Sequence, residues 1–301
     1  MNQPAASLPA ATLPQALSPI VAGLWRSAEW HQTTAERTHW IEQALELGIT
    51  SFDHADIYGH GRAEELFGDA LRVVPGLRNR LQLVTKCGIR LPSAAEQVHV
   101  KHYDTSPAYV RRRVEASLRH FGTDHLDRVL IHRPDVLMDA AELAETFAAL
   151  TREGKVLQWG ASNHSTAAFA LLHARYPLVT NQVEWSPLAL SALHDGTLDQ
   201  AQLLGLRPMI WSPLAGGRLL RGEDEMAQRV RAAMQPVADR WGVSLPTLAY
   251  AWILRHPSRP HPITGSGRIE GLREAVAALD VRLDAEDWYT IWTAAAGRPV
   301  P

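Results

Sequence analysis

Apolar positions follow two alternating patterns along the chain. Short runs such as 81–86 and 127–131, in which apolar and β-branched residues gather, have the length of strands buried on both faces. Between these runs, apolar residues recur every three or four positions, as at Trp40, Ile41 and Ala44, which is typical of an amphipathic helix. The pattern therefore predicts strands and helices that alternate from one end of the chain to the other.

Capping residues mark where several of these helices begin and end. Thr33 precedes Glu36 by three residues, which is the spacing of a capping box. Ser106 and Pro107 are suited to open a helix that Gly122 closes. We predict strands at 20–25, at a run ending at Asp53, and at 81–86, 127–131, 156–160, 178–183, 207–211 and 262–263, with helices near 63–71, 166–174, 196–204, 223–241 and 244–256.

Strands separated by helices, without a break in composition, favour parallel pairing with right-handed crossovers. The length of 301 residues is a little above the ~250 typical of an eight-stranded (β/α)8 barrel. A doubly wound open sheet is the rival fold, but 23–25 lacks the G-x-G-x-x-G fingerprint expected after its first strand. We predict an α/β TIM barrel as a single domain at 19–301, preceded by an extension at 1–18. A helical tail from Asp284 should cover the barrel or its mouth with Trp288, Ile291 and Trp292.

Composition narrows the classes of function. With 46% hydrophobic residues the chain can bury a large core, and a net charge of -2 gives no overall field for nucleic acid or an anionic membrane. Cys87 is the only cysteine, which suits a reducing compartment. The chain shows no signal-peptide pattern and no apolar run of the roughly 18 residues that a membrane span needs. We expect a cytoplasmic protein without nucleic-acid or membrane partners.

Reactive side chains stand at the ends of the predicted strands. Asp53, Lys86 and His132 each end or follow such a run, and in a parallel barrel these ends converge on one face. Tyr58 follows in the next loop, where the Lys86 ammonium should lower the pKa of its phenol and Asp53 should hold the ammonium in place. His132 is placed to donate a hydrogen bond to a carbonyl oxygen. Together these groups suit the reduction of a carbonyl by a hydride donor.

Structural explanations compete at several of these positions. Asp53 and Lys86 could be a buried ion pair that only stabilises the barrel, and Trp211 could be one packing residue among ten tryptophans. Cys87 could have a lowered thiol pKa beside Lys86 or be a small buried apolar residue. The run 111–113 (RRR) is interpreted as the solvent face of a helix. Fourteen histidines show no metal-ligand spacing, so we expect no metal.

From residue 23 to about 274 the sequence resembles the aldo-keto reductases, in particular the bacterial, NADP-dependent carbonyl reductases. The most specific segments are 53–59 (DHADIYG), 85–86 (TK), 126–134 (LDRVLIHRP), 154–156 (GKV), 160–163 (GASN), 181–182 (NQ) and 211–214 (WSPL). The resemblance implies a barrel that binds NADP(H) without a Rossmann domain and reduces aldehydes or ketones.

The same resemblance implies a role for individual residues. The family's catalytic tetrad corresponds to Asp53, Tyr58, Lys86 and His132, with Tyr58 as general acid. Its residues that hold the carboxamide of nicotinamide correspond to Ser162, Asn163 and Gln182, and Trp211 corresponds to the aromatic that stacks on the nicotinamide ring. The remaining residues of the implied cofactor site near these strands are Leu24, Trp25, Ser212, Pro213, Leu214 and Gly216.

A glycine-rich turn near the end of the chain suits a phosphate. Gly265, Ser266 and Gly267 lead into a predicted helix, whose exposed backbone N–H groups attract anions, and Arg268 adds a partner for a 2′-phosphate. Glu274 corresponds to the family residue that meets the adenine amino group. Two positions depart from the family, which often has amides where this chain has Gly271 and Ala275. These departures leave the preference for NADP over NAD open.

We therefore predict an oxidoreductase that reduces aldehydes or ketones with NADPH. A regulatory NADPH sensor with little turnover on the same barrel is the alternative. A barrel glycosidase is a third hypothesis, but it needs two carboxylates across the scissile bond, and only Asp53 is well placed. The pocket wall predicted from Trp25, Tyr58, His132 and Trp185 fits small aromatic or apolar carbonyls. Selectivity should come from the loops 89–104 and 186–195 and from the tail, and the sequence does not indicate an oligomeric state.

Overall fold

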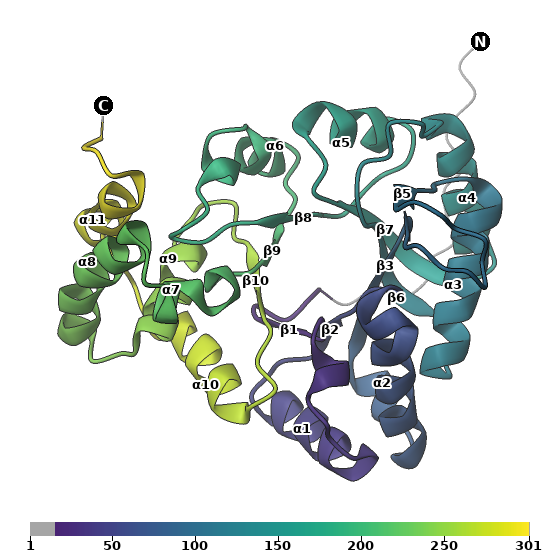
Figure 1. Cartoon of the computed structure of the whole chain (residues 1–301), viewed down its shortest axis with the longest axis horizontal. Coiled ribbons are helices and arrows are strands. Elements are labelled where there is room, and N and C mark those ends of the chain that lie inside the picture. Colours follow the sequence, from purple (N-terminus) through teal and green to yellow (C-terminus); the bar gives the residue numbers. More distant parts are fainter. Residues whose placement is uncertain (1–15, 301) are drawn as a thin grey trace.

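The computed structural model describes residues 16–300, and its parallel strands close into a barrel surrounded by helices (Figure 1). Around the barrel the strand order is β1-β10-β9-β8-β7-β6-β3-β2, and each strand pairs in parallel with both neighbours. The described strands of the barrel are β1 (Val21–Gly23), β2 (Ser51–Asp53), β3 (Gln82–Cys87), β6 (Leu126–Ile131), β7 (Val156–Ser162), β8 (Asn181–Glu184), β9 (Met209–Trp211) and β10 (His261–Thr264). The predicted barrel is confirmed, and the open sheet is excluded.

Helix termini follow the predicted capping residues in part. Thr33 and Glu36 form the capping box, and Gly122 ends its helix in the left-handed conformation, with φ 67°. Ser106 precedes that helix but makes no side-chain cap bond. The described helices are α1 (Thr34–Glu46), α2 (Arg62–Val73), α3 (Pro107–Phe121), α4 (Ala140–Arg152), α5 (Thr166–His173), α6 (Thr197–Leu203), α7 (Arg218–Arg221), α8 (Glu225–Trp241), α9 (Leu245–Leu254), α10 (Ile269–Ala277) and α11 (Ala285–Ala296).

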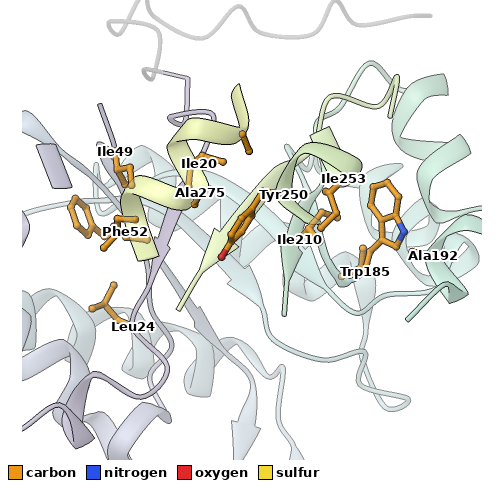
Figure 2. Close-up of a cluster of buried hydrophobic side chains, with 14 of the residues drawn as sticks. Ile20, Leu24, Ile49, Phe52, Trp185, Ala192, Ile210, Tyr250, Ile253 and Ala275 are labelled. Atoms are coloured by element: carbon orange, nitrogen blue, oxygen red, sulfur yellow. The ribbon is translucent and has the colours of Figure 1, made fainter. Parts of the chain in front are cut away.

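Alternation along the strands divides the core into two clusters. Val21, Val84 and Leu130 belong to a small cluster with Met209 and Ile263, while their strand neighbours belong to the large one. Because successive strand side chains point to opposite faces, the small cluster fills the barrel and the large one lies between strands and helices. Figure 2 shows part of the large cluster, with side chains of the barrel strands beside those of the outer elements.

Two connections differ from the expectations. The segment after β3 forms an antiparallel hairpin, β4 (Ile89–Arg90) with β5 (His102–Tyr103), in a region predicted only as a loop. At the other end of the chain α11 packs on α8, beside which it lies in Figure 1. Trp288 stacks on Trp252 of α9 with ring centroids 4.9 Å apart, and each indole N–H donates to the other residue's carbonyl oxygen at 3.0 Å. The tail therefore packs on the helical layer instead of covering the mouth.

The predicted extension at 1–18 is described only in its last residues, because residues 1–15 lie outside the part that the structure describes. Leu17 belongs to the cluster inside the barrel, and the buried hydroxyl of Ser18 donates to the carbonyl oxygen of Ile20 at 2.6 Å. Residues 17–18 therefore pack as part of the barrel. No helix between residues 16 and 300 is long and apolar enough to cross a membrane.

Candidate active site

The carboxyl ends of β2 and β3 bring three of the predicted catalytic groups together. Nζ of Lys86 donates to Oδ2 of Asp53 at 2.7 Å and to the hydroxyl oxygen of Tyr58 at 3.2 Å. A third bond, to the carbonyl oxygen of His54 at 2.7 Å, uses the remaining proton of the ammonium. Lys86 is buried, so its three partners hold the ammonium in one position.

A chain of hydrogen bonds extends from Asp53 across the mouth of the barrel. Nε2 of Gln182 donates to Oδ1 of Asp53 at 2.8 Å, and the carbonyl oxygen of Gln182 accepts from the hydroxyl of Ser162 at 3.0 Å. Asn163 donates from Nδ2 to Oγ of Ser162 at 2.8 Å and accepts from Nε1 of Trp211 at 3.0 Å. Four of the predicted cofactor residues are thus linked to the Asp53 carboxylate, on strand ends that are adjacent in the barrel.

His132 lies on the other side of Tyr58. The two rings meet edge to face with centroids 6.0 Å apart, and the backbone N–H of His132 donates to the carbonyl oxygen of Cys87 at 2.8 Å. Burial and the Lys86 charge hold the pKa of His132 well below its ordinary value. Nδ1 of its ring is buried and has no hydrogen-bond partner among the described residues. The imidazole is therefore neutral near pH 7 and free to donate through one nitrogen to a bound group.

Electrostatics in this cluster are dominated by burial. Burial raises the pKa of Tyr58, and the Lys86 charge offsets this only in part, so the expected lowering of the phenol pKa is wrong as a net effect. Burial also raises the pKa of Asp53 against the opposing effects of Lys86 and Gln182. For Lys86, burial acts to lower the pKa, but Asp53 and Tyr58 together raise it. Tyr58 is consequently a protonated phenol and Lys86 an ammonium near pH 7.

Backbone conformations around Trp211 are unusual. Asn163 and Ser212 have left-handed φ values of 59° and 52°, and Ala215, Gly216 and Gly217 follow at 50°, 65° and 94°. Such conformations cost free energy in residues other than glycine and persist only where the surroundings enforce them. They turn the 212–217 segment, which includes the predicted residues Pro213 and Leu214, directly after β9.

The first strand contributes Leu24 and Trp25 at the same end of the barrel. Leu24 is fully buried, and its N–H donates to the carbonyl oxygen of Asp53 at 2.9 Å. Trp25 is 57% exposed, with the Arg26 guanidinium 4.7 Å from its ring centroid. Leu24 therefore packs behind Asp53, and only Trp25 presents a surface to a ligand.

The predicted phosphate segment forms a turn before α10. Oγ of Ser266 accepts from the backbone N–H of Arg268 and donates to its carbonyl oxygen, at 3.1 and 2.8 Å. No side chain caps the N-terminus of α10, which leaves N–H groups of its first turn for an anion. A Cβ on Gly265 would meet nothing within 4 Å, so that side of the turn is open. These features fit the phosphate of a dinucleotide.

Packing explains both departures from the family pattern. A Cβ on Gly271 would lie 2.4 Å from Oγ of Ser266, so a larger residue would displace the turn. Ala275 is fully buried and belongs to the large core cluster. Glu274 is not free either, because its Oε1 accepts from the Ser244 hydroxyl at 2.8 Å.

Several other residues lie away from the site. Trp185 is fully buried and packs against Trp252 and His256, with ring centroids 5.2 and 5.3 Å away, so it is not part of a pocket wall. Burial raises the pKa of Cys87 well above its ordinary value, which favours an inert thiol. His54 is enclosed by the rings of two phenylalanines. Among residues 16–300, no three His, Cys, Asp or Glu side chains gather as a metal site.

One pair near the site contradicts the sequence interpretation. Arg113, assigned to the solvent face of α3, turns inward, and its Nε lies 2.7 Å from Oδ2 of the buried Asp56. Nothing in the local sequence indicated this contact, because the two residues are 57 positions apart. Met209 was missed for the same reason, although its sulfur lies 3.7 Å from Nε2 of Gln182.

Comparison with known proteins shows which protein family this sequence matches. Residues 19–295 match the Aldo/keto reductase family. Over 94% of this chain, the oxidoreductase YdhF of Escherichia coli is 46% identical (95% of its length), and a 6-dehydroglucose reductase of Agrobacterium fabrum is 42% identical (96% of its length). An aldo/keto reductase of Klebsiella pneumoniae, whose crystal structure contains NADP and acetate, is 28% identical with a TM-score of 0.74, covering 91% of this chain and 89% of the other.

Proposed function

Because the chain belongs to the aldo/keto reductase family, we propose that it reduces aldehydes or ketones to alcohols with NADPH, with Tyr58 as the proton donor. The observation that carries the proposal is the contact of Lys86 with both Asp53 and the Tyr58 hydroxyl inside a buried cluster. A phenol with a raised pKa keeps its proton until the substrate's carbonyl oxygen becomes a strongly basic alkoxide during the reduction, and the phenol then protonates that oxygen. The neighbouring ammonium then stabilises the phenolate that remains.

His132 and Lys86 take complementary roles in this proposal. The neutral imidazole donates a hydrogen bond to the substrate carbonyl oxygen and fixes its position against the Tyr58 hydroxyl. Lys86 stays charged throughout because Asp53 accepts one of its protons in a hydrogen bond. Proton donation and charge stabilisation are thus divided between side chains that do not exchange roles.

We assign the cofactor to the chain of polar groups that ends at Trp211. Asn163, Ser162 and Gln182 would hold the carboxamide, and the Trp211 ring would pack on one face of the nicotinamide. The bound NADPH would supply the hydride. At the other end, the uncapped N-terminus of α10 and Arg268 would hold the adenosine phosphate. The crystallised Klebsiella relative with NADP supports this choice of cofactor.

Charge at the mouth favours a polar carbonyl over an apolar one. Arg133 is half-buried and electrostatically affects both Tyr58 and His132. Glu184, whose pKa burial raises, also interacts with Arg133. With Trp185 in the core, the aromatic wall expected from the sequence is reduced. The name of the Agrobacterium relative makes an oxidised hexose a substrate to test beside simple aldehydes.

The test is NADPH oxidation, followed by absorbance, over a panel of simple aldehydes, ketones and oxidised sugars. We expect turnover by the wild type and a fall in kcat of about 10²- to 10⁴-fold in Tyr58→Phe, the range that a general acid contributes. NADPH affinity should change less than about twofold, because the phenol hydroxyl lies outside the proposed cofactor contacts. Wild-type turnover in Tyr58→Phe would refute the mechanism, and NADPH binding without any turnover would favour a sensor.

A further inference from the structure

The loop that carries Tyr58 is bent in a way that needs support from outside. Directly after Tyr58, Gly59, His60 and Gly61 have φ values of 56°, 57° and 90°. Three consecutive left-handed residues, one of them not glycine, store conformational strain. Contacts elsewhere must hold this bend, because the loop would otherwise relax and move the Tyr58 hydroxyl.

Asp56 supplies these contacts two residues before Tyr58. Its N–H donates to the carbonyl oxygen of Lys86 at 3.0 Å, which ties the loop to β3. Its Oδ2 accepts from Nε of Arg113 at 2.7 Å, and its carbonyl oxygen accepts from Nη2 of Arg113 at 3.2 Å. The guanidinium thus donates hydrogen bonds to both the side chain and the main chain of the same loop residue. Asp56 is 1% exposed, so its contact with Arg113 is shielded from solvent.

The helix that carries Arg113 is itself anchored beside this contact. Glu64 of α2 is fully buried, and its Oε1 accepts from the hydroxyls of Thr85 in β3 and Ser117 in α3, at 2.6 and 2.8 Å. Its Oε2 lies 3.0 Å from Nδ1 of His120. Because α2, α3 and β3 are joined at this point, Arg113 acts from a support with little freedom to move.

We propose that Arg113 and Asp56 are positioning residues that hold the Tyr58 hydroxyl against Nζ of Lys86. The consequence for catalysis rests on the function proposed above, whereas the effect on the loop does not. Neither residue touches the tetrad's reacting atoms. They act through the backbone between Asp53 and Tyr58, whose two ends carry the carboxylate and the phenol. A misplacement of about 1 Å at such a site can reduce turnover about 10²-fold.

The groups that face Asp56 determine its pKa, and therefore the pH range in which it forms an ion pair with Arg113. Burial raises the pKa of Asp56 to about 7, Arg113 opposes that shift, and Glu64 adds to it. Tyr109 of α3 and Cys87 of β3 also face the carboxyl, and burial raises the pKa of each, so both are neutral near pH 7. The full ion pair therefore forms as the pH rises through neutrality, and Oδ1 of Asp56 has no partner among the described residues.

Helix α3 offers a matched control for the experiment. Arg111 on the same helix also makes two contacts with a carboxylate, from Nη1 and Nη2 to the two oxygens of Glu153 at 2.7 Å each. That pair joins α3 to the end of α4 and does not contact the Tyr58 loop. We therefore compare Arg113→Met with Arg111→Met, measuring kcat, KM, NADPH affinity and the solvent isotope effect on kcat.

We expect Arg113→Met to lower kcat about 10- to 100-fold and to raise the solvent isotope effect, with NADPH affinity within about twofold of the wild type. Arg111→Met should keep kcat within about twofold. Arg113→Lys retains the charge but lacks the planar guanidinium that donates two hydrogen bonds, so its kcat should lie between those of the wild type and Arg113→Met. It replaces Arg113→Met in the comparison if that variant does not fold. Equal kcat in Arg113→Met and Arg111→Met, or a parallel loss of kcat and NADPH affinity in Arg113→Met, overturns the proposal.

Amide hydrogen exchange of the segment 53–62 separates this proposal from the proposed function. We expect faster exchange in Arg113→Met than in Arg111→Met, whether or not a substrate is known. If the wild type turns over no carbonyl, the proposed function fails, and the exchange rates still decide the positioning role. Equal exchange in the two variants would show that Arg113 does not hold the loop.

Discussion

Lys86→Met should destabilise the fold because it leaves the Asp53 carboxylate buried without its counter-ion. Asp53 is 3% exposed, and Gln182 would be the only remaining hydrogen-bond partner of its carboxylate among the described residues. Removing one member of a buried pair typically costs about 3–5 kcal/mol. The carboxyl can escape its charge by taking up a proton. The ordinary pKa of this carboxyl is 3.8, about three units below pH 7. At about 1.4 kcal/mol per unit, protonating it at pH 7 costs about 4 kcal/mol. We therefore expect the unpaired Asp53 charge alone to cost about 4 kcal/mol near pH 7.

The pH dependence of this loss follows from the same argument. Burial raises the pKa of Asp53 even beside Lys86, and the variant loses that opposing charge, so its stability is retained below about pH 4 and is lost more steeply than in the wild type as the pH rises. The difference from the wild type should therefore shrink as the pH is lowered from 7 towards 4. An orphaned carbonyl oxygen at His54 adds about 1–3 kcal/mol that does not depend on pH.

A double-mutant cycle tests whether charge is the cause. Asp53→Asn alone leaves the ammonium of Lys86 buried and unpaired, whereas Asp53→Asn with Lys86→Met leaves no charge at all. We expect the double variant to cost at least about 2 kcal/mol less than the sum of the two single variants. Equilibrium urea unfolding followed by tryptophan fluorescence gives these free energies. Additive losses, or single losses below about 1 kcal/mol, would refute the reasoning.

Two further predictions concern α2, α3 and the loop between β2 and α2. The folded pKa of Asp56, about 7, lies above its ordinary 3.8, so the stability tied to this group is present below about pH 4 and lost as the pH rises through 7. The free energy of unfolding of Asp56→Asn, relative to that of the wild type, should therefore increase by up to about 1.4 kcal/mol for each unit that the pH rises from 4 towards 7. Urea unfolding at several pH values measures this difference, and a difference that does not change with pH would contradict the prediction. Gly68→Ala would place a Cβ 2.0 Å from the carbonyl oxygen of His120 and should cost at least about 2 kcal/mol by the same assay. Gly265→Ala, with nothing within 4 Å of the added Cβ, is its control and should cost less than about 1 kcal/mol.

Local features of the chain were sufficient to predict the barrel and the positions of its strands. Apolar runs of strand length and the helical periodicity between them arise from contacts between near neighbours, so a sequence pattern records them. The predicted strand ends at Asp53, Lys86 and Gly160 lie within two residues of the observed ends at Asp53, Cys87 and Ser162. Because parallel strands must converge at one face, the meeting of these side chains followed from order along the chain.

The arrangement of the contacts was decided only by the tertiary structure. Gln182 reaches Asp53 across 129 positions and Arg113 reaches Asp56 across 57, so neither pair leaves a periodic signal. Burial produced the raised pKa of Tyr58 against the effect of Lys86, and the balance of two opposing terms depends on how completely the surrounding elements exclude water. The sequence by itself determined which chemical groups stand at the barrel mouth. Distances, burial and the support of the Tyr58 loop required the folded chain, because they depend on which distant segments pack against each other.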